Sequence, residues 1–191
     1  QFDLKIKKST VYTIPKAEGG FYTISFDGCK FWLSGYRKEI YIWDKENNST
    51  NILRDFPRQF GIYNFARNEK YILDCERTVY DTPAFIESRV AGNYIWFIPF
   101  QTNKIIYVDR VTFQVNVLEN EENESISSLS SYYLAHKYLV LYMEDDRYIG
   151  LFSFKDNSVL EIDAIKMTIV KKVYSFGQEY LNTFMAALEK N

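Results

Sequence analysis

Short apolar runs recur along the chain in groups of four, and residues typical of turns separate them. In three such groups an apolar residue lies seven positions before a turn residue, and an aspartate follows that turn residue by 16 or 17 positions. The turn residues are Gly28, Gly92 and Asp146, and the closing aspartates are Asp44, Asp109 and Asp163. Apolar runs bounded in this way are typical of β-strands. The pattern predicts three all-β units, each of four antiparallel strands in about 35–40 residues.

The closing aspartates have a structural explanation. An aspartate at the end of a strand can cap the following turn by accepting hydrogen bonds from backbone N–H groups. We therefore expect Asp44, Asp109 and Asp163 to cap the turn between the third and fourth strands of their units. The repeat of this residue does not require a catalytic role.

The repeat also sets the expected boundaries. Residues 1–191 are interpreted as a single domain or fragment, with four-stranded units at residues 21–56, 85–119 and 138–176. Two insertions interrupt them, at residues 57–84 and 120–137. Asp3 lies eight residues before Val11, as Asp109 lies eight before Val117. We therefore expect residues 3–14 to form the last strand of a preceding unit.

The C-terminal segment has a different periodicity. Apolar residues at 181, 184, 185 and 188 follow the i, i+3, i+4, i+7 spacing of an amphipathic helix. This spacing predicts a short helix at residues 178–190. A competing interpretation is the first strand of another four-stranded unit, beginning near Tyr180.

Several predicted strands are apolar on both faces. Residues 105–108 are four apolar residues in a row, and residues 138–143 are six. A sheet with one solvated face should alternate, whereas stacked sheets buried on both faces need not. The pattern favours a β-propeller-like stack of blades over its alternative, a β-sandwich.

The repeated order of turn, apolar-aromatic run and closing aspartate resembles the blades of the broad kelch, WD-repeat and YVTN-type β-propeller superfamily. Trp43-Asp44 matches the WD dipeptide by position, and Gly19-Gly20 is similar to the kelch glycine pair. Later units lack both features, so the resemblance assigns no subfamily. It implies four-stranded blades around an axis, and propellers host enzymes, scaffolds and receptors alike.

Three units fall short of the common closed rings of about four to eight blades, and the chain starts at Gln1. We therefore expect a partial ring. Its open blade edges could allow self-association.

The amino-acid composition and charge of the chain argue against some classes of function. Aromatic residues make up 18% of the chain, which suits packed β-strands. The 23 basic and 25 acidic residues give a net charge of −2. Nucleic-acid binding usually needs a broad positive field, so no nucleic-acid partner is expected. No apolar run is long enough to span a membrane as a helix, and the sequence leaves the cellular compartment open.

No cofactor or metal site is predicted. The single histidine, His136, has no second histidine or cysteine cluster near it. Cys29 and Cys75 are interpreted as free thiols, with one disulfide as the alternative. No phosphate loop, dinucleotide fingerprint or nucleophile motif is present, and no catalytic residue is assigned.

Two functions remain open at this stage. The first is a binding or scaffold module that presents propeller loops to a protein, peptide or glycan. The second is part of a carbohydrate-active or other enzyme whose site needs further blades. In either case, the loops between the second and third strands should share one face with the long insertions, and loops on a rigid scaffold commonly carry binding. The candidate ligand-binding residues on that face are Tyr36, Arg37, Phe100, Asn103 and Lys104, with Tyr63 and Arg67 at its rim.

Overall fold

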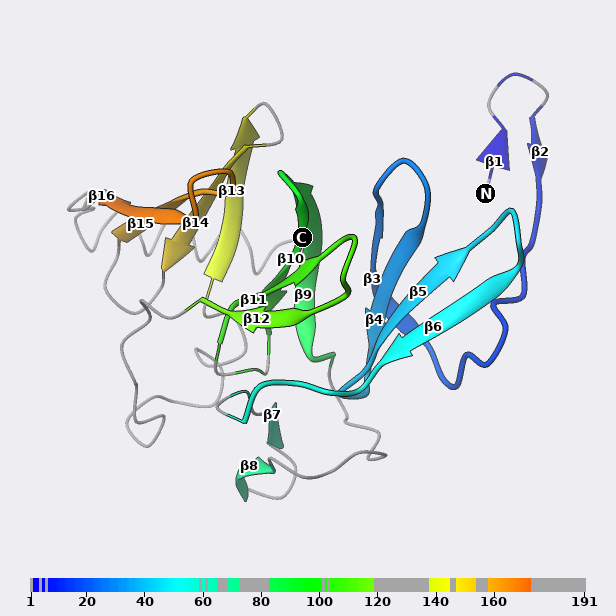
Figure 1. Ribbon diagram of the computed structural model, residues 1–191, viewed down its shortest axis with the longest axis horizontal. Helices are drawn as coiled ribbons and strands as arrows, with labels where there is room; N and C mark the ends of the chain where they lie inside the picture. Colours follow the sequence, from blue (N-terminus) through cyan, green and yellow to red (C-terminus); the bar gives the residue numbers. More distant parts are fainter. Residues whose placement is uncertain are drawn as a thin grey trace, which may run out of the picture.

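The computed structural model describes most of the repeat region. It covers residues 2–3, 5, 7–58, 60, 62–64, 69–72, 83–100, 102, 104–118, 138–144, 147–153 and 158–172. These residues form three four-stranded antiparallel sheets and two short hairpins (Figure 1). The insertion at 120–137 and the predicted helix at 178–190 lie outside the described residues.

Each sheet is a meander in which strands that follow one another in the chain are neighbours. The first sheet contains β3 (Phe21–Phe26), β4 (Phe31–Gly35), β5 (Ile40–Asp44) and β6 (Ser49–Leu53). The second contains β9 (Phe85–Ala91), β10 (Tyr94–Pro99), β11 (Ile106–Asp109) and β12 (Val115–Val117). The third contains β13 (Tyr138–Glu144), β14 (Tyr148–Ser153), β15 (Ser158–Asp163) and β16 (Thr168–Lys172). The predicted four-stranded antiparallel units are confirmed, while the extent of the domain over residues 1–191 stays a prediction.

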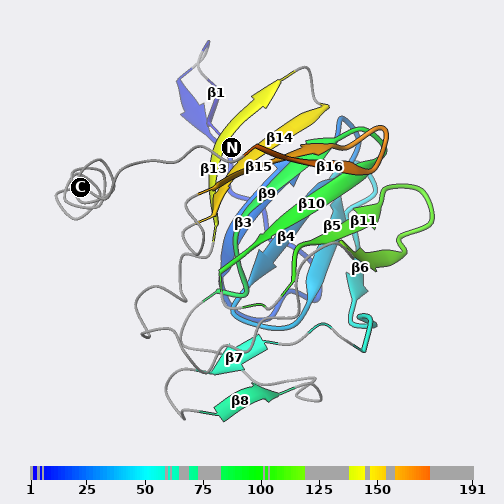
Figure 2. The same ribbon diagram turned by 90° about the vertical axis from the view of Figure 1, so that its left-hand side faces the viewer.

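The three sheets stand side by side in chain order and face one another (Figure 1). In the perpendicular view they overlap in projection, as sheets stacked face against face do (Figure 2). Trp32 and Ile42 of the first sheet pack with Phe97 and Val108 of the second. The opposite face of the second sheet packs against the third, in a cluster that contains Trp96, Ile98, Ile149, Leu151 and Ile162. The second sheet is therefore apolar on both faces because it has a neighbouring sheet on each side.

The closing aspartates occupy equivalent turns. One carboxylate oxygen of Asp44, Asp109 and Asp163 accepts hydrogen bonds from the backbone N–H groups two and three residues further on, at 2.8–3.1 Å. The fourth residue after each aspartate has a positive φ: 47° at Asn48, 61° at Phe113 and 54° at Met167. The predicted capping of these turns is confirmed.

The N-terminal segment differs from its prediction. Within residues 2–9 there are two strands, β1 (Phe2–Asp3) and β2 (Lys8–Ser9), which form an antiparallel hairpin. Asp3 pairs with Lys8 and Lys7 has a φ of 52°, the arrangement seen between Asp44 and Ser49. The chain reverses between Asp3 and Lys8, so residues 3–14 are not one continuous strand.

The first insertion also contains strands, as β7 (Ile62–Asn64) pairs with β8 (Glu69–Ile72). Both strands lie at the end of the stack opposite the β3–β4 turn (Figure 1). Among the described residues no helix has the length and apolar character that a membrane span requires.

Candidate functional site

The predicted surface is built from two loops of neighbouring sheets. Residues 36–39 connect β4 to β5, and residues 100–105 connect β10 to β11. Ala84 joins the two loops, because its N–H donates to the carbonyl of Gly35 (3.1 Å) and its carbonyl accepts from the N–H of Phe100 (3.0 Å). Backbone hydrogen bonds of this kind fix the position of one loop relative to the other. Ala84 thus links the start of one loop to the start of the other.

The predicted residues differ in their exposure. The side chains of Tyr36, Arg37 and Phe100 are partly exposed on these loops. Lys104 is only 7% exposed, so its side chain is part of the interior, in contrast to the role expected of it on the surface. The backbone of Tyr63 lies in β7, whereas Asn103 and Arg67 lie outside the described residues.

Arg37 is held by a partner that the sequence pattern did not indicate. Its guanidinium Nη1 lies 3.0 Å from the Oε2 of Glu18, in the segment that precedes β3. The Glu18 side chain is 68% exposed, while that of Arg37 is 20% exposed. An exposed pair of this kind contributes little stability. Its consequence is orientation, because it fixes a cation beside Tyr36.

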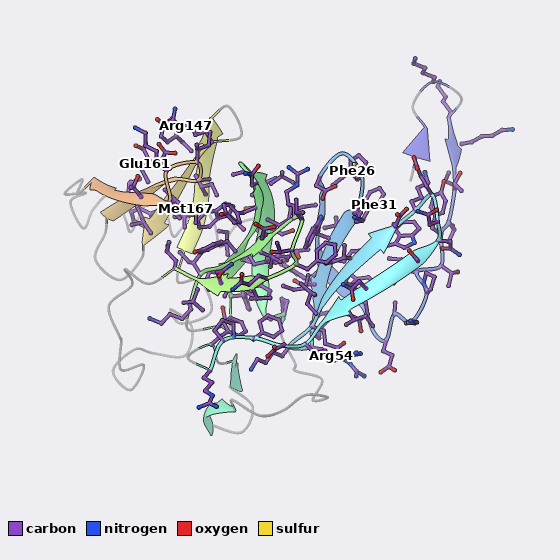
Figure 3. The ribbon with its side chains drawn as sticks, viewed as in Figure 1. Phe26, Phe31, Arg54, Arg147, Glu161 and Met167 are labelled. Atoms are coloured by element: carbon purple, nitrogen blue, oxygen red, sulfur yellow. The ribbon has the colours of Figure 1, made fainter. Side chains whose placement is uncertain are left out.

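A second cation, Arg54, is held by a buried carboxylate. The carboxylate of Glu39 is buried, and its Oε1 accepts from the Nε of Arg54 at 2.7 Å. Its Oε2 accepts from the hydroxyl of Tyr41 at 2.5 Å. Burial, followed by the hydrogen bond and the charge of Glu39, raises the pKa of Tyr41 to about 12, so that the phenol remains a donor. Arg54 is half exposed at the end of β6 (Figure 3) and was not among the predicted residues.

A lysine lies over an aromatic pair on the same surface. The ammonium of Lys38 lies 5.6 Å and 5.7 Å from the ring centroids of Phe56 and Phe60. These two rings are stacked with a centroid separation of 5.0 Å. A cation at this distance from an aromatic face is attracted by the ring quadrupole. We define the loop surface as Tyr36, Arg37, Lys38, Arg54 and Phe100, together with Glu18.

The opposite end of the stack, at the β3–β4 turn, carries a carboxylate with a structural role. Asp27 accepts from the backbone N–H groups of Cys29 and Lys30 and from the indole N–H of Trp32, at 2.7–2.8 Å. Burial opposes ionisation, but these hydrogen bonds and the charge of Arg110 leave the pKa of Asp27 below its usual value. Arg110 also donates to the backbone carbonyl of Asp27 at 2.5 Å, which ties the first sheet to the second.

No group of three or more histidine, cysteine, aspartate or glutamate side chains suited to a metal ion occurs in the part of the chain that the structure describes. The loop surface offers oriented cations, one exposed carboxylate and partly exposed aromatic rings.

Comparison with known proteins identifies the fold. No protein-family model matches the chain, and no curated protein matches it in sequence. Among solved structures, it is similar to the β-propeller domain of Cps50 (Swd1) from Myceliophteria thermophila, with a TM-score of 0.52 and 11% identity. The match covers 92% of this chain and 49% of that domain, so the chain spans about half of the length of the propeller it resembles. At this identity the similarity concerns the fold alone. The three stacked four-stranded sheets are blades, and the chain has a β-propeller fold.

Proposed function

We propose that this protein is a binding scaffold that presents the loop surface to a polypeptide partner. The observation that supports the proposal is the linkage of two blade loops through Ala84, which holds cations and aromatic rings in fixed positions on one surface. Side chains that are ordered before binding lose less conformational entropy when a partner binds. Arginine and tyrosine are also the residue types that most often contribute large shares of binding energy.

The charges on the surface indicate the chemistry of the partner. Arg37, Lys38 and Arg54 are cationic, and Glu18 is the exposed carboxylate among them. The mixed signs suit a polypeptide segment that carries an acidic side chain next to aromatic or aliphatic ones. A glycan would stack on the aromatic rings and make less use of the charged side chains.

The test is a selection of binding peptides against the full chain, from a displayed random library, with a glycan array probed in parallel. We expect peptides that contain an acidic residue beside an aromatic one. Their affinity should fall by about tenfold or more in Tyr36→Ala and in Arg37→Ala, which corresponds to about 1.4 kcal/mol.

Val111→Ala is the matched control, because Val111 is exposed on the turn after β11, at the other end of the second blade. Peptides that bind Tyr36→Ala and Arg37→Ala as tightly as the original protein, but lose affinity for Val111→Ala, would place the binding surface at the opposite end. Glycans that bind in the absence of any selected peptide would favour a carbohydrate ligand.

A further inference from the structure

The two arginines of the loop surface differ in how much of each guanidinium group is already engaged. Arg37 meets Glu18 through Nη1, its Nε is buried without a hydrogen-bond partner, and its side chain is only 20% exposed. Arg54 meets Glu39 through Nε at 2.7 Å, and its side chain is 51% exposed. Among the described residues, no hydrogen bond or ion pair uses Nη1 or Nη2 of Arg54. The end of the Arg54 guanidinium group is therefore available to a partner.

Glu39 holds Arg54 from the interior of the first blade. Its side chain is 2% exposed, and a buried carboxylate needs hydrogen bonds and a nearby cation to offset the loss of water. Its second oxygen accepts from the hydroxyl of Tyr41, so both carboxylate oxygens are engaged. Because Glu39 is fixed in this way, the Nε of Arg54 is fixed as well. The guanidinium group is thus oriented before any partner binds.

The same polar network includes the segment that precedes β3. Burial is the main cause of the raised pKa of Tyr41, while a backbone hydrogen bond from Glu18 and the charge of Arg37 act in the opposite direction. Both groups therefore lie close to the phenol of Tyr41. The hydrogen bond to Glu39 is the main cause of the raised pKa of Arg54, and the charge of Glu18 adds to it. The two arginines thus belong to one network on the loop surface.

The exposed end of Arg54 suits one kind of group. A guanidinium group presents parallel N–H donors whose spacing matches the two oxygens of a carboxylate, so both oxygens can be bound at once. A neutral amide offers one oxygen and no charge, and it would be bound less tightly. A carboxylate of the partner is therefore the group that Arg54 is equipped to select.

A purely structural role is the competing explanation, because the buried Glu39 needs a cation beside it. That role requires a positive charge near Glu39 but neither a planar group nor an exposed end. A lysine at this position would supply the charge, since its ammonium group can also donate to a carboxylate oxygen, but it lacks the second, parallel donor. Replacement of Arg54 by lysine therefore separates the structural role from a role in binding.

We propose that Arg54 binds the acidic side chain of the polypeptide partner, with Nη1 and Nη2 donating to the two oxygens of a glutamate or aspartate carboxylate. This inference rests on the proposed function of the loop surface and assigns one of its residues to one group of the partner. Arg37 is already paired with Glu18, so it lines the surface beside Tyr36. The preference for an acidic residue comes from Arg54.

Three short probes test the assignment: acetyl-Tyr-Glu-Tyr-amide, acetyl-Tyr-Gln-Tyr-amide, and acetyl-Tyr-Gln-Tyr with a free C-terminal carboxylate. Acetyl and amide groups remove the terminal charges, so the first probe has its only carboxylate on the side chain. In titrations to about 10 mM, followed by NMR shifts of loop amides, the full chain should bind the glutamate probe at least about fivefold more tightly than either glutamine probe. In Arg54→Lys this preference should disappear, with the midpoint of urea denaturation unchanged. NMR reports on folded molecules, so the preference is measured even if the variant is less stable.

Arg58→Lys is the matched control, because Arg58 is exposed in the connection that follows β6 and is not one of the described partners of Glu39. It should keep the preference for glutamate. The assignment would be overturned by equal binding of the two amidated probes, by no binding of either at about 10 mM, or by a preference that survives Arg54→Lys. A preference lost equally in Arg58→Lys, or shown equally for the free C-terminus, would also overturn it.

Failure of the proposed function has a different signature. In that case the probes would bind Tyr36→Ala and Arg37→Ala as tightly as the original protein. Probes that depend on Tyr36 and Arg37 but show no dependence on Arg54 would leave the loop surface as the binding site and overturn only the role of Arg54.

Discussion

The first and second blades share one strand plan and one register, but their surroundings differ. Phe31 pairs with Trp43 in the first blade as Ile95 pairs with Val108 in the second. Ile95 and Val108 are fully buried, because another blade covers that face, whereas the face of the first blade is left open along β3. Trp43 is buried like its equivalent Val108, but Phe26 is 52% exposed at the position that the partly buried Val90 occupies in the second blade. The comparison shows that the apolar pattern of a strand specifies a blade, and that the neighbouring sheet decides whether its face is available for binding.

Equivalent tryptophans in the two blades also differ in their hydrogen bonding. Trp32 pairs with Ile42 as Trp96 pairs with Tyr107, and both indoles are fully buried. Trp32 donates its indole N–H to Asp27, while that of Trp96 has no hydrogen-bond partner among the described residues. The reason is the preceding turn. Four residues, including Asp27, connect β3 to β4, whereas only Gly92 and Asn93 connect β9 to β10.

The largest expected effect on the free energy of unfolding comes from removing one aromatic ring from each of two corresponding blade faces. Phe97→Ala, in the covered face of the second blade, should lower the free energy of unfolding by about 3–5 kcal/mol, because it leaves a cavity between two sheets. Phe26→Ala removes a half-exposed ring and should cost about 1 kcal/mol. Urea denaturation measures both. Equal losses would mean that the ring of Phe26 is packed as tightly as that of Phe97 in the folded chain.

An intermediate effect is expected from replacing each tryptophan by phenylalanine. Trp32→Phe should cost about 1.5–3 kcal/mol beyond the loss of volume, since it leaves a partly desolvated carboxylate oxygen of Asp27 without its donor. Trp96→Phe removes an indole N–H that has no partner in the described structure, and should cost about 1.5–3 kcal/mol less than Trp32→Phe. Unfolding monitored by circular dichroism provides the comparison. A larger loss for Trp96→Phe would reveal a hydrogen bond to that indole.

The smallest expected effect is the loss of stability at low pH, when the turn aspartates become protonated. Hydrogen bonds from Arg147 and from backbone N–H groups hold the pKa of Asp163 well below its usual range, and backbone N–H groups lower the pKa of Asp109. A lowered pKa in the folded state means that the unfolded state binds more protons in this range. The stabilisation is thus present above the usual pKa of about 3.8 and is lost as the pH falls toward the folded value.

Thermal unfolding between about pH 5 and pH 2 should show this loss. Asp163→Asn should remove more of the acid sensitivity than Asp109→Asn, because only Asp163 is paired with an arginine among the interactions described for the two turns. If both variants keep the full pH dependence of the original protein, other carboxylates are responsible for it.

The elements that depend on local chemistry could be predicted from the sequence alone. The strands follow from apolar runs between turn residues, and the aspartate-capped turns at Asp44, Asp109 and Asp163 follow from hydrogen bonds that span only three residues. The stacking of blades followed from strands without a polar face, since such strands need cover on both sides. The partial exposure of Tyr36 and Arg37 also agrees with their prediction as loop residues.

Contacts between distant parts of the chain were decided only by the tertiary structure. The sequence indicated neither the pairing of Arg37 with Glu18 and of Arg54 with Glu39, nor the burial of Lys104. These depend on which segments meet at the ends of the sheets. The exposure of β3 has the same origin. A run of alternating apolar residues fixes which side chains share a face, but what covers that face depends on a neighbouring sheet or a second molecule, and no local pattern encodes that neighbour.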